Sequence, residues 1–160
     1  MLRAMEGWRE KALETLPELS GELADEHEVF SPYTLWFKLL PRVCQAHQDG
    51  DDKLLARIYA LAEWSRSQPE KEIWNPVCVS FYEHLFDEPW MRPLVPRWLS
   101  DKAVADAWPL WEYRLAPDAL AEVRALLRGK MPRSTPAPRQ SASDRRRRES
   151  RRRGERRDRR

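Results

Sequence analysis

Apolar residues recur every three or four positions along most of the chain, the spacing that places them on one face of an α-helix. Near the N-terminus, Met5, Trp8, Ala12 and Leu16 follow this spacing with charged residues between them. No segment before the C-terminal tail requires a strand. The pattern predicts an all-α fold, a single compact multi-helix domain. We expect helices at residues 1–16, 18–27, 32–48, 52–67, 76–86 and 100–108, and a last one that opens at Pro117 and stops at Gly129.

Residues that favour helix starts precede several of these segments. Side chains of serine, asparagine and aspartate accept bonds from the free amides of a first turn, and proline has no amide to leave unsatisfied there. Ser31 stands before Pro32, and Ser100 stands before the sixth segment. Asp51 or Asp52 is placed to cap the fourth helix, directly after a turn that contains Gly50. These signals predict where the helices begin.

Prolines also predict where helices break. Pro41 should kink or split the third helix, because an interior proline removes a backbone hydrogen bond and clashes with the preceding turn. Three prolines in residues 86–97 divide that stretch into turns or one short helix. We expect Trp90, Leu94 and Trp98 to attach this connector to the domain.

The third helix shows the strongest apolar spacing. Tyr33, Trp36, Phe37 and Leu40 stand at positions i, i+3, i+4 and i+7. Residues at these positions share one face of a helix, so the pattern predicts that all four are strongly buried.

Residues Val77–Phe86, with the sequence VCVSFYEHLF, form the most apolar run, and we expect the rest of the chain to be organised around them. Asn75 and Pro76 suit the cap and first position of a helix, and Phe81 would lie at its centre. A strand is the alternative, because Val77, Val79 and Phe81 alternate. That alternation fails at Glu83, which favours the helix.

Tyr82, Glu83 and His84 lie in this run and form either an interaction site or a buried polar site. Adjacent residues on a helix point about 100 degrees apart, so Glu83 and His84 cannot form an acid–base couple by themselves. The structural explanation is that they bond to the backbone, to Arg57 or Arg66, or to Tyr59.

Charge divides the chain into two parts. The net charge of the whole sequence is +3. Residues 130–160 contain fourteen basic and four acidic residues, which leaves a net charge of −7 on residues 1–129. Residues 130–160 read first as a Pro/Ser-rich and then as an Arg-rich disordered tail, with almost nothing to bury. The folded domain is therefore expected to be acidic.

The Arg-rich tail offers one route to nucleic acid. Flexible arginine-rich segments neutralise phosphates without reading sequence. Contact with a membrane surface or an acidic protein, and a passive solubilising role, are the alternatives. The candidate non-specific RNA or DNA contacts are Arg145, Arg146, Arg147, Arg148, Arg151, Arg152 and Arg153.

No motif indicates enzyme chemistry. The sequence lacks a Gly-rich phosphate loop, a GxSxG turn and an HExxH pair, so we expect no catalytic residue and no cofactor. Cys44 with His47 and Cys78 with His84 are the only pairs suggestive of a metal, and they do not make a zinc motif. No window is long and apolar enough to span a membrane. Free thiols and a cytoplasmic location are expected.

Four stretches resemble a family of small bacterial helical domains of uncharacterised function. They read PELS, SPYTLW, GDDKLLARIYALAEWS and VCVSFYEHLF, cover about Pro17–Leu99, and are most specific at VSFYEHL. Such domains are similar in size and acidity to proteins of bacterial interaction and conflict systems, which implies an immunity-type or accessory role; the resemblance supplies no catalytic residue. We therefore expect a non-enzymatic protein-interaction domain with an unknown, basic protein partner. The alternative is a nucleic-acid-associated protein that acts through its tail.

The tail hypothesis predicts that any RNA binding resides in residues 145–160. If about five phosphates of single-stranded RNA are neutralised, the slope of log affinity against log salt should be near −3.5, from about −0.7 per contact. Titration of labelled RNAs of unrelated sequence against the full chain and a chain ending at Gly129 measures this. Binding retained by the shorter chain would contradict the hypothesis. As a control, the shorter chain should melt within a few degrees of the full chain.

Overall fold

The computed structural model of the protein describes residues 2–23 and 31–130, and within these ranges it is all-helical and contains no strand. The predicted fold class is confirmed. The elements are α1 (Leu2–Thr15), the 3₁₀ helix η1 (Pro17–Leu19), α2 (Ser20–Leu23), α3 (Pro32–Asp49), α4 (Asp52–Arg66), α5 (Lys71–Ser80), the 3₁₀ helices η2 (Tyr82–His84) and η3 (Pro96–Trp98), α6 (Asp101–Arg114) and α7 (Pro117–Leu126).

The helices α3 and α4 form a hairpin at the centre of the molecule. Gly50 ends α3 with a φ of 68°, a left-handed conformation that glycine adopts without steric cost. Asp51 then caps α4 by accepting a hydrogen bond from the amide of Leu54 at 3.0 Å. The predicted turn and cap are confirmed.

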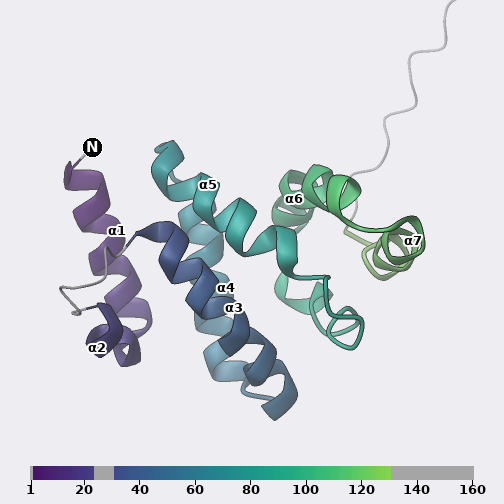
Figure 1. Ribbon diagram of the computed structural model, residues 1–160, viewed down its shortest axis with the longest axis horizontal. Coiled ribbons are helices and arrows are strands. Elements are labelled where there is room, and N and C mark those ends of the chain that lie inside the picture. Colours follow the sequence, from purple (N-terminus) through teal and green to yellow (C-terminus); the bar gives the residue numbers. More distant parts are fainter. Residues whose placement is uncertain (1, 24–30, 131–160) are drawn as a thin grey trace, which may run out of the picture.

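The remaining helices pack around this hairpin. The helix α5 lies across both α3 and α4, and α1 packs against α4. Figure 1 shows α1 and α2 at one end of the molecule and α6 and α7 at the other. The helix α6 contacts η2 and α5. The segment that follows α5 therefore joins the central helices to the C-terminal pair.

The caps at Ser31 and Ser100 are confirmed. Each serine oxygen accepts a bond from the amide three residues later, Thr34 at 3.2 Å and Ala103 at 3.0 Å. The helix predicted at residues 18–27 appears as η1 and the short α2, and its residues 24–30 lie outside the described ranges. The last helix begins at Pro117 as predicted and ends at Leu126, before Gly129.

Residues Val77–Phe86 do not form one helix, so this prediction is wrong in its boundaries. The helix α5 begins at Lys71, where the amides of Ile73 and Trp74 both bond to the carbonyl of Glu70. Burial of Ile73 favours this earlier start. Pro76 therefore lies inside the helix instead of opening it. The helix ends at Ser80 because Phe81 leaves helical geometry, with φ −129° and ψ −68°.

Phe81 is nevertheless at the centre of the core. Its side chain is fully buried, and its ring contacts rings from three elements. Trp36 of α3 lies at 5.2 Å, Tyr59 of α4 at 5.6 Å and Tyr82 of η2 at 5.5 Å between ring centroids. Tyr59 in turn stacks on Trp98 at 5.7 Å. Leu85 and Phe86, which follow η2, are buried as well.

Two other prolines lie inside unbroken helices. Pro41 does not split α3, and α6 continues through Pro109 to Arg114, beyond the predicted end at Trp108. Both prolines lie on exposed positions, where water can reach the carbonyls that they leave without an amide partner. Beyond Pro109, Trp111 is buried and donates its Nε1–H to the carbonyl of Tyr82 at 2.7 Å. This packing stabilises the longer helix.

The connector between η2 and α6 consists of turns and η3, as the prolines predict. Trp98 packs against the core as expected, but Trp90 and Leu94 are 39% and 38% exposed. The buried anchors are Met91, Val95 and Leu99. These three residues recur every four positions, so the sequence contained a periodic signal for their burial. The larger tryptophans were selected instead.

Replacing Phe81 with alanine should lower the free energy of unfolding by about 3 to 5 kcal/mol, because it leaves a cavity among three packed rings. Phe37→Ala is the matched control. It removes the same ring from a site where it is 56% exposed, and should cost less than about 1 kcal/mol. Denaturant unfolding of both variants measures the difference. A normal midpoint for Phe81→Ala would show that this ring is not central.

Candidate functional site

The structure places Tyr82, Glu83 and His84 together in η2, directly after the break in α5. They do not share one environment. The ring of Tyr82 is buried, whereas Glu83 and His84 are half-buried at the surface. The three residues therefore belong to two different polar groups, one inside the domain and one at its edge.

The group at the edge is a charge cluster of Glu83, His84, Asp87 and Arg114. His84 Nδ1 lies 2.9 Å from Asp87 Oδ2, and a carboxylate can only accept, so Nδ1 carries the proton. Arg114 donates to both oxygens of Asp87, through Nε at 2.9 Å and Nη2 at 2.8 Å. Glu83 lies 3.7 Å from the Arg114 guanidinium. The cluster ties η2 to the last turn of α6.

These contacts differ from the partners expected for Glu83 and His84. Arg57 pairs with Glu18, Arg66 pairs with Glu63, and the Tyr59 hydroxyl lies 3.2 Å from His47 Nε2. These two partners were not predicted from the sequence. Asp87 lies in the segment expected to be a connector, and Arg114 lies beyond the predicted end of the sixth helix at Trp108. The spacing of three residues between His84 and Asp87 was the sequence signal that could have predicted this pair.

Asp87 is the residue on which the edge cluster depends. Burial by itself would raise the pKa of Asp87, but hydrogen bonds from Arg114 and His84 outweigh this and hold the pKa below its ordinary value. Protonation of Asp87 would therefore lower the stability of the folded domain. Chemically, the bond to Asp87 fixes the orientation of the His84 imidazole, and the charges of Asp87 and Arg114 are already engaged with each other.

The interior group contains the Tyr82 hydroxyl and Arg66. The side chain of Arg66 is 5% exposed, and its guanidinium bonds to Glu63 at 3.1 Å and to Asp106 of α6. Burial raises the pKa of Tyr82, and the carboxylate of Glu63 raises it further, so the phenol stays protonated. A buried arginine between two carboxylates joins α4 to α6, which is a structural role.

One face of α3 is apolar and open to solvent. The predicted burial of Tyr33 and Phe37 is wrong, since they are 42% and 56% exposed. The helix buries the neighbouring face instead. The residues of that face also recur at helical spacing in the sequence, which was the available signal for their burial: Leu35, Trp36, Leu39, Val43 and Ala46.

We call Tyr33, Phe37, Leu40 and Cys44 the α3 stripe. They follow one another at spacings of four, three and four, and Leu40 and Cys44 are half-buried. At one end, Asn75 of α5 donates its amide proton to the Tyr33 hydroxyl at 2.7 Å. At the other end, burial raises the pKa of the Cys44 thiol and the nearby charge of Glu88 raises it further. The charge of Glu88 therefore acts on the Cys44 end of the stripe.

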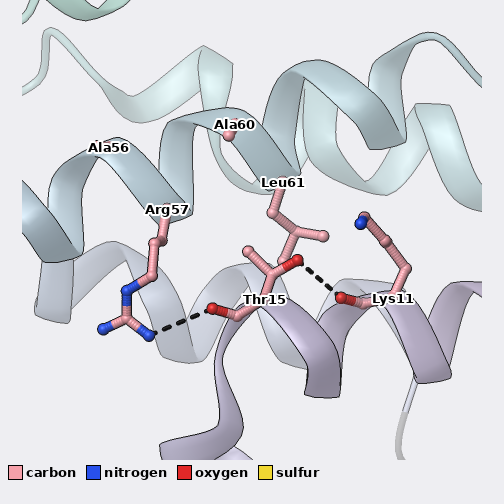
Figure 2. Close-up of a pocket in the computed structure, with 6 residues that line it drawn as sticks. All are labelled: Lys11, Thr15, Ala56, Arg57, Ala60 and Leu61. Carbon is pink, nitrogen blue, oxygen red and sulfur yellow. Dashed lines mark hydrogen bonds between the residues drawn. The ribbon is translucent and has the colours of Figure 1, made fainter.

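A second surface feature is a trough between α1 and α4, with a volume of about 330 Å³. Figure 2 shows Arg57 reaching from α4 to the carbonyl of Thr15 on α1. No sequence pattern predicted this trough. Its lining residues are Lys11, Thr15, Ala56, Arg57, Ala60 and Leu61.

Cys44 and Cys78 are free thiols, as expected, and both are half-buried. Within residues 2–23 and 31–130 no group of three histidine, cysteine or acidic side chains is arranged to hold a metal ion. The helices in the same ranges include none with the length and apolar character to cross a bilayer.

Residues 9–108 match the model of a protein family described as domain of unknown function DUF7674. The chain belongs to this family. The predicted resemblance to an uncharacterised helical family is confirmed, and the match extends beyond the Pro17–Leu99 stretch on both sides. No curated protein and no solved structure matches the chain.

The DUF7674 region contains both surface features and part of the edge cluster. The α3 stripe and the trough lie wholly inside residues 9–108, as do Glu83, His84 and Asp87. Arg114 and α7 lie beyond it. The candidate nucleic-acid contacts in residues 145–153 lie outside both the match and the described residues.

The variant Asp87→Asn should lower stability at pH 7 by about 1 to 2 kcal/mol, because Arg114 and His84 lose a charged acceptor. The lowered pKa of Asp87 means that its stabilisation is present above the ordinary carboxyl pKa of about 4 and is lost as the pH falls through the lowered value. The two proteins should therefore converge in strong acid. Melting curves between pH 7 and pH 2 test this.

Glu10→Gln is the control for this pH series, since Glu10 is an exposed carboxylate on α1. Its melting temperature should follow that of the unaltered protein throughout. A constant difference between Asp87→Asn and the unaltered protein at every pH would contradict the assigned role of the Asp87 charge.

Proposed function

We propose that this domain is a non-enzymatic protein-interaction module and that the α3 stripe is its binding surface. The observation that carries the proposal is the exposure of Tyr33 and Phe37, one turn apart on a helix whose other face is buried in the core. Surface aromatics that are fixed on a rigid element supply contact area at a small cost in side-chain entropy. Asn75 further fixes Tyr33 through its hydroxyl.

The exposed part of Phe37 is large enough to act as one anchor residue of an interface. A phenylalanine side chain buries 150 to 250 Å² when covered, so the exposed half of Phe37 amounts to roughly 100 Å². At about 25 cal/mol per Å², covering it contributes about 2.5 kcal/mol. That is the size of a binding hot spot. Tyr33 and Leu40 would extend the same contact along the helix.

The chemistry of the partner follows from the surroundings of the stripe. The apolar spacing along α3 suits an apolar helix or an extended segment laid beside it. Glu88 adds a negative charge next to Cys44, and residues 1–129 have a net charge of −7. We therefore expect a partner segment that combines apolar side chains with at least one lysine or arginine. We propose an immunity-type or accessory role, because such roles are carried out by binding another protein.

The non-enzymatic part of the proposal is supported by the state of the polar groups. His84 is held by Asp87, which is itself engaged with Arg114, and Arg66 is buried between Glu63 and Asp106. Each cluster bridges two elements of the fold. We also propose a cytoplasmic location, which the free thiols of Cys44 and Cys78 support.

Nucleic-acid contact through the tail remains the second candidate. The observation that favours it is the density of eleven arginines in residues 145–160. This hypothesis concerns residues outside the described ranges, and the salt titration against the chain ending at Gly129 decides it. The two candidates are independent, because the α3 stripe lies in the folded domain.

The variant Phe37→Asp should weaken partner binding by roughly thirtyfold or more, which corresponds to the loss of a 2 kcal/mol hot spot. Tyr113→Asp is the matched control, because Tyr113 is 91% exposed on α6, away from the stripe. Proteins captured from extracts of the source organism are purified and titrated against both variants. Equal loss in both variants, or undiminished binding by folded Phe37→Asp, would contradict the assignment of the surface.

Glu88→Lys tests the charge of the partner separately. It leaves the apolar stripe intact and reverses the charge beside Cys44. A basic partner should bind this variant more weakly and with a smaller dependence on salt. A partner whose affinity rises with Glu88→Lys is acidic, which would overturn the stated chemistry while leaving the surface assignment in place.

A further inference from the structure

The trough between α1 and α4 is hollow because small residues stand where larger ones would fill it. Ala56 and Ala60 are four residues apart on the outer side of α4, and both are exposed. Leu61 is buried and provides an apolar floor. The Thr15 hydroxyl donates its proton to the carbonyl of Lys11 at 2.8 Å, so its donor is already used inside α1. The lining of the trough is therefore mostly apolar (Figure 2).

Both ionisable residues that line the trough are basic, although the domain as a whole is acidic. They are Lys11 on α1 and Arg57 on α4. No acidic side chain belongs to the lining, and Glu14 and Glu18 pair with these bases from outside it. The ionisable side chains of the lining are thus cationic, and each is paired with one carboxylate beside the trough.

The two bases differ in what holds them. Arg57 is fixed, since Nη1 donates to the Thr15 carbonyl at 3.2 Å and the guanidinium makes a bidentate pair with Glu18 at 2.8 and 2.9 Å. These bonds stabilise the end of α1, where a cation opposes the negative end of the helix dipole. Arg57 therefore forms a wall whose charge is already compensated.

Lys11 is available to a ligand. Its Nζ lies 2.8 Å from Glu14, three residues further along the same exposed helix face. Exposed pairs of this kind contribute about 0 to 1 kcal/mol, so Lys11 can exchange Glu14 for another anion at little cost. One exchangeable ammonium beside an apolar trough suits a ligand with one negative charge. A second charge would meet no uncompensated cation in the lining.

We propose that this trough binds an amphipathic monoanion of the fatty-acid type. The carboxylate bonds to Lys11 Nζ, the apolar chain lies over Ala56, Ala60 and Leu61, and Arg57 closes the far side. The volume of about 330 Å³ is at the lower end of ligand sites, which predicts a short ligand and weak, reversible binding. This site is separate from the α3 stripe and does not depend on the proposed function.

Titrating octanoate into the full chain, below the concentration at which octanoate aggregates, tests the proposal. Amide shifts in a ¹H–¹⁵N spectrum should concentrate at residues 11–15 and 56–61. Octanol, which has the same chain without the charge, should bind more weakly. Lys11→Met should lower the affinity for octanoate by up to about fivefold, to the level of octanol, because one exposed charge pair is worth up to about 1 kcal/mol.

Ala60→Leu fills the trough with a good helix former at an exposed position, so the protein should fold and lose binding of both ligands. Lys102→Met, on α6, is the matched charge control and should bind octanoate normally. Equal affinity for octanoate and octanol would overturn the charge assignment. Shifts centred on the α3 stripe, or binding that survives Ala60→Leu, would overturn the site.

Discussion

The packing of the Phe81 ring is the interaction on which the rest of the structure depends. Phe81 meets rings from α3, α4 and η2 at centroid distances of 5.2 to 5.6 Å, so three elements share one contact point. To bring the ring there, the backbone leaves helical geometry at this residue. The next residues then turn inward, where the Tyr82 carbonyl accepts the Trp111 indole proton and places α6. One break in a helix thus positions both halves of the domain.

The sequence predicted the helices better than their ends. Local signals that act within one turn, such as Ser31, Asp51, Gly50 and Ser100, were read correctly because a cap needs only its own amide partners. The prolines that lie inside helices were misread, because the local destabilisation that each causes is offset by packing with residues distant in the sequence. Pro76 and Pro109 lie inside helices that buried Ile73 and Trp111 hold together.

The surfaces were harder to predict than the core. On α3 two apolar stripes fit the same helical period, and only the packing of α5 and α4 decides which one is buried. The predicted set contained residues of both: Trp36 is buried, whereas Tyr33 and Phe37 are exposed. The partners of Glu83 and His84 lay in segments whose structure was misjudged, and the trough arises from Ala56 and Ala60, residues that carry no sequence signal.

The domain has a packed aromatic core and two surface features outside it, the α3 stripe and the trough between α1 and α4. Two arginines connect elements of the fold: Arg66 links α4 to α6, and Arg114 of α6 pairs with Glu83 of η2 and with Asp87. The proposed binding surface requires the α3 stripe to be free in solution. Relaxation of ring protons by a soluble paramagnetic probe measures this directly. We predict that Tyr33 and Phe37 relax as strongly as exposed Tyr113, while Phe81 and Trp36 stay protected. Protection of Phe37 equal to that of Phe81 would contradict the account.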